Sequence, residues 1–309
     1  MIEVRGLRKS YGDLLAVDQV SFAAGTGEIY GLLGPNGAGK TTILSIVSGL
    51  LKADAGSVII GGVSLEADPR RAKSMLGVVP QDVTLYEELS ARENLLFWGK
   101  IYGLGGKDLD GRIQELLAKA GLAEKAKAPV RSYSGGMKRR LNLLTGLVHR
   151  PKVLLLDEAT VGIDPQGRLA IQDMVREIAG SGTTVIYTTH YLEEAENLCR
   201  RVAIMDHGRI LVEGTIPELM KQQGEGEVVA ISGAFGEGEI RAALQGREEI
   251  EIHHLEEGRA LLSVFLPGPE VFRLLDGLLA RMTTVDEISI RKPSLTSLFI
   301  KLTGREIRD

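Results

Sequence analysis

The sequence predicts an α/β protein whose larger part is built on a mainly parallel sheet and whose end forms a smaller α+β domain. Over residues 1–222 short apolar runs alternate with helical patterns, as in parallel βα units. A glycine-rich loop, GPNGAGKT at 34–41, stands between an apolar run and a helical pattern. The order of elements changes after KQQGEGE at 221–227. We therefore expect one domain over 1–222 and an accessory domain over 223–309.

The strands of the larger domain are expected at short apolar runs. These runs lie at 27–34, 56–60, 76–79, 153–156, 184–188 and 202–206. Between 91 and 122 apolar residues instead recur three and four positions apart, which indicates helices. We expect a helical subdomain over about 85–150, inserted between core strands.

The order predicted after residue 223 is β-α-β-β-α-β, the ferredoxin-like plan. Its strands are expected at 228–232, 249–255, 259–266 and 284–290, and its helices at 236–245 and 269–281. A last amphipathic helix follows Pro293, with Gly304 as its stop. We expect its apolar face to form core or dimer packing rather than a ligand site; that face contains Leu295, Leu298, Phe299 and Leu302.

Composition and charge exclude several classes of protein. The chain has 309 residues, 44% hydrophobic and 25% charged, and a net charge of −4, so no overall basic field exists to attract nucleic acid or an anionic membrane. Cys199 is the single cysteine, which excludes an internal disulfide and suits a reducing cytoplasm. No stretch approaches the ~20 apolar residues that span a bilayer. Any membrane contact is therefore expected through a partner.

The loop at 34–41 fits the phosphate-binding pattern G-x-x-x-x-G-K-[ST]. Its glycines allow a tight turn with N–H groups directed at a phosphate, and the following helix adds its positive end. Lys40 supplies a charge for the β- and γ-phosphates, and the Thr41 hydroxyl can bind Mg²⁺. The residues expected to bind the nucleotide here are Gly34, Pro35, Asn36, Gly37, Ala38, Gly39, Lys40, Thr41 and Thr42.

Further candidate residues follow three other predicted strands. Asp157 and Glu158 end VLLLDE, where the first can hold Mg²⁺ through water and the second can polarise an attacking water. His190 ends TVIYTTH on the same edge of the sheet. Gln81 lies in VVPQD, from which its side-chain carbonyl can reach the metal. The sequence thus predicts Lys40, Glu158 and His190 as catalytic residues and Thr41, Gln81 and Asp157 as metal ligands.

A second anion-binding segment is expected at Ser134, Gly135 and Gly136, directly before the helical pattern MKRRLNLLTGLVHR. One chain has no use for two such sites on one γ-phosphate. A dimer does, if each chain offers this segment to the nucleotide held by the other. We therefore expect a homodimer that forms on ATP binding.

Together these residues resemble the ATP-binding cassette (ABC) ATPases, and the resemblance covers 1–222 in order. It implies a P-loop NTPase core with antiparallel N-terminal strands and a head-to-tail dimer with two ATP molecules at the interface. It also implies that Tyr11 stacks on adenine, that Gln81 is in the Q-loop, that His190 is the switch histidine and that 133–137 is the signature. The family's LSGGQ reads YSGGM here, and its SALD reads VGID at 161–164.

Three longer segments sharpen the resemblance. YSGGMKRRLNL, LYEELSARENLLFWGKIYG and PSLTSLFIKLTGREIRD are similar to the ATPase subunits of exporters with type-2 permeases, in particular the daunorubicin-resistance group. This similarity implies a separate membrane permease, docked through residues near 82–100, and a cytoplasmic subunit held at the inner face of the cell membrane. Drug, lipid, polysaccharide and ion exporters share such a subunit, and importers remain a second possibility.

Two other functions stay open. The first is an ABC-type ATPase that acts on nucleic acid or ribosomes. The strong basic cluster near a motif is Lys138, Arg139 and Arg140, which we interpret as a solvated helix face, so no nucleic acid is expected. The second is a small-molecule phosphotransferase, which the combination of SGG, Glu158 and His190 disfavours.

Overall fold

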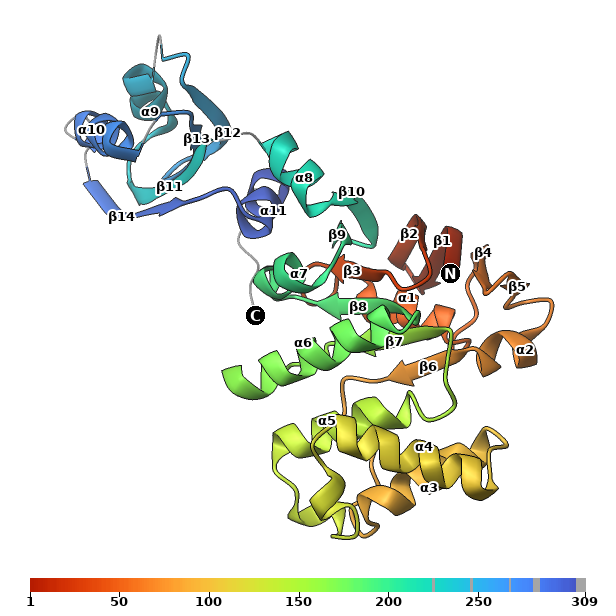
Figure 1. Ribbon diagram of the computed structural model, residues 1–309. Coiled ribbons are helices and arrows are strands. Elements are labelled where there is room, and N and C mark those ends of the chain that lie inside the picture. Colours follow the sequence, from red (N-terminus) through yellow and green to blue (C-terminus); the bar gives the residue numbers. More distant parts are fainter. Residues whose placement is uncertain (224–225, 245–246, 267, 280–283, 304–309) are drawn as a thin grey trace. The chain divides into compact units, whose positions relative to one another are not determined.

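The computed structural model describes residues 1–223, 226–244, 247–266, 268–279 and 284–303 (Figure 1). The chain divides into two compact units, Met1–Val212 and Glu213–Asp309. This division falls ten residues before the boundary expected at 222/223. The expected helix ends at 245 and 280–281 and the stop at Gly304 lie outside the described residues.

The main sheet has six strands. They are β3 (Ile29–Leu33), β6 (Leu76–Val79), β7 (Val153–Asp157), β8 (Thr184–Thr189), β9 (Arg201–Asp206) and β10 (Arg209–Thr215). Their order is β10-β9-β3-β8-β7-β6, and the five strands from β9 to β6 pair in parallel. Every residue of β3, β7 and β8 is buried, as expected for central strands covered on both faces. The carboxyl ends of these strands therefore meet at one edge.

A second sheet is antiparallel in its pairings and contains β1 (Ile2–Tyr11), β2 (Leu14–Ala24), β4 (Ala55–Ile60) and β5 (Val63–Ser64), in the order β2-β1-β4-β5. The apolar run at 56–60 thus forms a strand of this sheet and not of the parallel one. Helix α1 (Lys40–Val47) shares one apolar cluster with both sheets, which joins Ile43 of the helix to Val4 of β1 and Leu155 of β7. This cluster holds the start of α1 at the end of β3.

The insertion between β6 and β7 is helical, as predicted (Figure 1). It contains α3 (Ala91–Ile101), α4 (Gly106–Lys119), α5 (Gly135–Thr145) and short 3₁₀ turns at Ala123–Lys125 and Val130–Ser132. Helix α3 begins with a capping box in which Ser90 and Glu93 satisfy each other's backbone N–H groups. The remaining helices of the first unit are α2 (Pro69–Ser74), α6 (Pro165–Gly180) and α7 (Leu192–Leu198).

The second unit contains β11 (Glu227–Ala234), β12 (Ile250–Glu256), β13 (Arg259–Val264) and β14 (Thr284–Arg291), with α8 (Ile216–Gln223), α9 (Glu237–Leu244), α10 (Gly268–Leu279) and α11 (Leu295–Thr303). The sheet order β12-β13-β11-β14, with antiparallel neighbours, is the ferredoxin-like arrangement. One face packs on α9 and α10. On the other face Ile300 of α11 contacts Val228 and Leu261.

The apolar face of α11 is mostly core. Leu295, Leu298 and Phe299 are buried, whereas Leu302 is 43% exposed. Among the described residues, no helix is both long enough and apolar enough to cross a membrane.

Candidate nucleotide-binding site

The loop between β3 and α1 has a backbone that requires glycine at two positions. Gly34 and Gly39 have φ angles of 151° and 100°, in the region that L-residues rarely adopt. A Cβ atom at Gly34 would collide with the carbonyl oxygen of Met205, and one at Gly39 with that of Ala16. Close backbone approach thus requires glycine at these two positions of the predicted phosphate loop. Such a tight turn can direct its N–H groups toward a phosphate.

Lys40 is the first residue of α1 and is buried, with only 4% of its surface exposed. Its ammonium donates to the carbonyl oxygens of Gly34, at 2.7 Å, and Pro35, at 3.0 Å. It also lies 3.3 Å from the Glu158 carboxylate. Burial lowers the pKa of Lys40, while the charges of Glu158 and Asp157 act in the opposite direction. The ammonium of Lys40 is therefore held in place by two backbone carbonyls of the loop and by the Glu158 carboxylate.

Two acids stand at the carboxyl end of β7. Asp157 is the last residue of that strand, and its carboxylate accepts a hydrogen bond of 2.7 Å from the Thr188 hydroxyl of β8. Glu158 follows with a φ angle of 45°, and its N–H donates to the same hydroxyl at 3.0 Å. Because Asp157 is paired with Thr188 in the parallel ladder, one threonine positions both acids. Both are buried.

His190 follows the last residue of β8, beside these acids. Its Nδ1 lies 3.1 Å from one Glu158 oxygen, while the other Glu158 oxygen faces Lys40 at 3.3 Å. A continuous chain of contacts therefore joins Lys40 at the start of α1, Glu158 after β7 and His190 after β8. The sequence placed these residues on one edge, and the structure brings them into contact.

The residues at this edge fit a magnesium ion as well as phosphate. Thr41, in the first turn of α1, carries an exposed hydroxyl, and Asp157 supplies a carboxylate, which are the oxygen ligands that Mg²⁺ prefers. In the described parts of the chain no cluster of three or more His, Cys, Asp or Glu could hold a metal by itself. An ion here would be completed by phosphate oxygens and water, as is usual for Mg²⁺.

Three predicted elements do not join this chain of contacts. Gln81 is exposed, and its backbone carbonyl, not its side chain, is bound, by Arg139. Tyr11 is 49% exposed at the end of β1, where the Lys9 ammonium lies 5.9 Å from its ring centre. Ser134 caps α5 by accepting a hydrogen bond from the N–H of Met137 at 3.3 Å. Within the described residues no hydrogen bond or ion pair links Ser134–Gly136 to the phosphate loop.

The basic run after this segment is not the solvated face that we predicted. Lys138 forms an ion pair of 2.5 Å with Glu87, and Arg140 donates to the carbonyl of Ala120 at 2.6 Å. Arg139 donates to the backbone carbonyls of Gln81 and Val161. The prediction relied on the general rule that charge runs on helices are solvated. It was wrong here because all three side chains reach acceptors that are distant in the sequence. Arg139 thereby connects α5 to the segments that follow β6 and β7.

A mainly parallel sheet that carries a phosphate loop, two strand-end acids and a contacting histidine on one edge defines a P-loop ATPase. The sequence profile of the family described as "ABC transporter" matches residues 17–161. A linearmycin resistance ATP-binding protein of Bacillus subtilis is 39% identical over the full length of both chains. A Nod factor export ATP-binding protein of Sinorhizobium fredii is 40% identical over this whole chain and 87% of its own length.

Similarity continues in further relatives and in solved structures. A daunorubicin resistance ATP-binding protein of Streptomyces coeruleorubidus is 37% identical over 99% of this chain and 97% of its own. The solved ATP-binding subunit of an ABC transporter superposes with a TM-score of 0.66 at 28% identity, over 72% of this chain and 93% of that one. The chain therefore belongs to the ATP-binding subunits of ABC transporters. It binds ATP and hydrolyses it.

Proposed function

We propose that this chain is the motor subunit of an exporter, and that it drives a separate membrane permease through ATP-dependent dimerisation. The observation that carries this proposal is the buried chain of contacts from Lys40 through Glu158 to His190. It supports ATP hydrolysis because it places a base next to the charge that receives the phosphates. Relatives named for drug resistance and for Nod factor export support the outward direction.

The residues of the proposed site divide the work of binding and hydrolysis. Glu158 orients and polarises the attacking water, and His190 holds Glu158 and contacts the γ-phosphate. Lys40 and the N–H groups of 34–42 bind the phosphates, and Tyr11 stacks on adenine. Thr41, Asp157 and Gln81 would hold Mg²⁺, which would supply positive charge to offset the charge that develops during phosphoryl transfer. Gln81 reaches the ion only if its exposed side chain turns toward it.

We propose the dimer because the segment Ser134–Gly136 is mostly exposed and forms no hydrogen bond or ion pair with the phosphate loop of its own chain among the described residues. Ser134 and Gly135 are exposed at the start of α5, where N–H groups can bind an anion. A solved ATP-binding cassette with ADP and phosphate bound is dimeric; it is 25% identical and superposes with a TM-score of 0.63 over 70% of this chain. Each chain would then complete the site of the other.

The proposed permease contact includes the segment expected near 82–100 and continues to Leu104. Six large apolar side chains are exposed there: Val83, Tyr86, Phe97, Ile101, Tyr102 and Leu104. The rings of Tyr86 and Phe97 pack edge to face with their centres 4.9 Å apart, so these two side chains support each other at the surface. Exposed apolar surface of this kind often marks an interaction site. We place the subunit at the cytoplasmic face of the cell membrane through this contact alone.

The test is a pull-down of tagged Glu158→Gln protein, with ATP, from gently solubilised native membranes. The expected co-purifying chain is a polytopic membrane protein without an ATPase domain. Phe97→Ser in the same background should lose that chain, whereas Phe272→Ser, at an exposed phenylalanine of α10, should retain it. Ribosomal proteins or nucleic acid without a membrane protein would transfer the function to the rival class of ABC ATPases. No observation favours that class, since the basic run at 138–140 is bound internally.

A further inference from the structure

Helix α7 carries a buried carboxylate to which no function has been given above. Glu194 is 4% exposed, although Glu193 beside it is exposed. A buried ionised group costs several kcal/mol in lost hydration unless its partners compensate. The partners of Glu194 therefore indicate its role.

Three hydroxyl groups and one guanidinium surround the Glu194 carboxylate. One oxygen accepts hydrogen bonds from Thr160 at 2.8 Å, from Tyr187 at 3.0 Å and from Thr189 at 3.3 Å. The other oxygen lies 3.1 Å from Nε of Arg168, as an ion pair. Each of the three hydroxyls donates to this one oxygen, so the carboxylate ties together three residues from different segments. The pKa of the Tyr187 hydroxyl is raised well above its usual value by burial and by this neighbouring charge, so it stays a donor.

Two of the donors adjoin residues of the proposed hydrolytic site or the segment that directly follows it. Thr160 stands directly before VGID at 161–164, the segment that follows Glu158. Thr189 stands directly before His190, and its hydroxyl also accepts the N–H of Tyr191 at 2.9 Å. Glu194 therefore holds the chain on both sides of His190 through one threonine.

The ion-pair partner returns to the same histidine. Arg168 of α6 lies over the ring of Tyr191, with its guanidinium carbon 4.8 Å from the ring centre. The Tyr191 and His190 rings are 4.1 Å apart. Contacts thus run from Glu194 to His190 by two routes, and from Glu194 to the 161–164 segment by a third. Among the residues that the structure describes, none of these contacts involves the phosphate loop at 34–41.

We propose that Glu194 is a positioning residue for ATP hydrolysis, which holds His190 and the 161–164 segment in register with Glu158. The inference rests on the function proposed above. A group placed about 1 Å wrong can cost about a hundredfold in rate, so a shared anchor for two segments has a direct kinetic value. Glu194 does not contact the phosphate loop. Removing its carboxylate should therefore lower turnover and leave nucleotide affinity intact.

The experiment compares Glu194→Gln with Glu193→Gln in the full-length chain with Mg²⁺, well below the melting temperature of each. Glutamine keeps the size of the side chain but replaces the carboxylate facing Arg168 by a neutral amide. We expect kcat to fall about tenfold in Glu194→Gln, with KM and the affinity for a non-hydrolysed ATP analogue within about twofold of wild type. Glu193→Gln, at an exposed position of the same helix, should match wild type.

A second variant tests the route through Thr160 and keeps the proposal testable if Glu194→Gln does not fold. Thr160→Val removes only the hydroxyl and should also lower kcat. If both residues act through one contact, the kcat of the double variant should be no lower than that of the less active single variant. Independent, multiplied losses would show that Glu194 does not act through this segment.

The remaining outcomes separate the two proposals. Wild-type kcat in folded Glu194→Gln, or an equal loss of analogue binding, would overturn the positioning role while ATP hydrolysis by the wild type stands. No hydrolysis by the wild-type chain would overturn the proposed function itself.

Discussion

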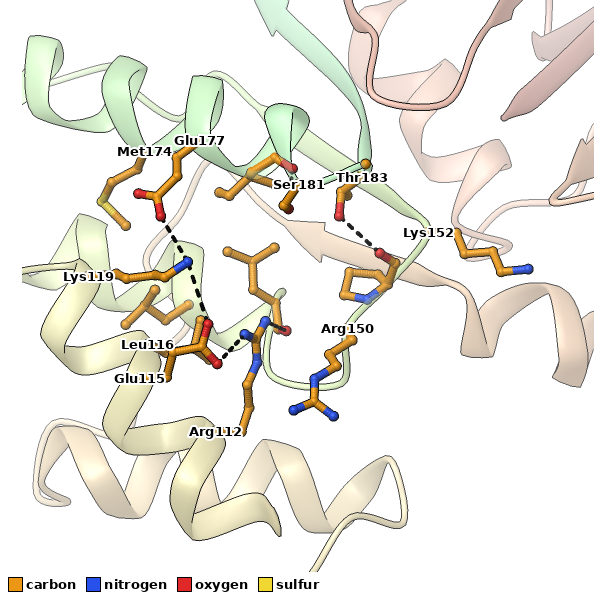
Figure 2. A pocket seen from close by; sticks show the side chains of 15 residues that line it. Arg112, Glu115, Leu116, Lys119, Arg150, Lys152, Met174, Glu177, Ser181 and Thr183 are labelled. Carbon is orange, nitrogen blue, oxygen red and sulfur yellow. Dashed lines mark hydrogen bonds and ion pairs between the residues drawn. The ribbon is translucent and has the colours of Figure 1, made fainter.

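Both edges of the main sheet carry chains of charged residues. Comparing their burial distinguishes charges that serve a reaction from charges that only join helices. At the carboxyl edge, Lys40, Glu158 and His190 are in contact, with side chains 3%, 7% and 9% exposed. At the other edge, before β7 and β8, a cavity of about 350 Å³ lies between α4, the turn at 147–152 and the end of α6 (Figure 2).

Ion pairs cross the side of this cavity. Glu115 pairs with Arg112 at 3.0 Å and with Lys119 at 3.5 Å, and Lys119 continues to Glu177 of α6 at 2.8 Å (Figure 2). Lys119 and Glu177 are 46% and 57% exposed. Exposed pairs of this kind contribute little, whereas buried charges are expensive to maintain. The carboxyl edge is therefore the one at which charge serves chemistry.

The largest expected effect is on turnover in Glu158→Gln. The change removes the group that we propose activates water and keeps the residues that we propose bind the phosphates. We expect ATP to bind, hydrolysis to fall by about 10²–10⁴-fold and the dimer to persist. Phosphate release and size-exclusion chromatography with ATP measure these outcomes. Near-normal turnover would show that the base is another residue.

Lys40→Ala should come next, as a loss of nucleotide affinity. A charge-assisted hydrogen bond is worth about 1.5–3 kcal/mol, and each 1.4 kcal/mol is tenfold, so binding should weaken about ten- to a hundredfold. Lys119→Ala is the matched change in the ion-pair chain of the opposite edge and should leave affinity unchanged. Affinity is measured with a fluorescent ATP analogue. Equal losses of affinity in the two variants would show that the two edges do not differ in nucleotide binding.

Ser134→Ala tests whether the carboxyl edge is completed by a second chain. Nucleotide binding by the monomer should survive, while hydrolysis falls by about tenfold because one phosphate donor from the partner is lost. Ser132→Ala, at a nearby exposed serine, is the control. Equal loss of monomer binding in Ser134→Ala would mean that the site is not shared.

The smallest effect is expected for Glu177→Gln, which breaks the contact of Lys119 with α6. The free energy of unfolding should fall by about 0.2–1 kcal/mol, less at high salt, with kcat unchanged. Trp98 is the one tryptophan of the chain and lies in α3, so its fluorescence during urea denaturation reports on the first unit. A loss above about 2 kcal/mol would show that this ion-pair chain stabilises the fold as strongly as a buried one.

The sequence predicts best those features whose backbone and chemistry are both set by residues that are consecutive in the chain. The loop at 34–41 is of this kind, because its glycines, lysine and flanking elements are consecutive, and so is the acid pair that ends β7. The run at 56–60 identified a strand but not its sheet, since an apolar run does not choose a partner strand. Gln81 was predicted from position alone, and the direction of its side chain depends on contacts that no local pattern records.

Glu194 shows why the rest of the site could not be predicted. In the run YLEEAEN, Glu193, Glu194 and Glu196 resemble the polar side of a surface helix. Only the packing of α7 against residues 160, 187 and 189 buries one of them. Arg139 was misread for the same reason, because its acceptors lie 58 and 22 positions away.

Helix α11 has a consequence for the second unit. Four-stranded sheets of ferredoxin-like topology recognise single-stranded RNA when aromatic residues on an uncovered face stack against bases. Here Ile300 of α11 packs on Val228 and Leu261 of that face, and the buried Phe299 lies in the same helix. Around Val228 and Leu261 this face therefore packs against a helix of its own chain, and these two central strands offer no open platform there on which a base could stack.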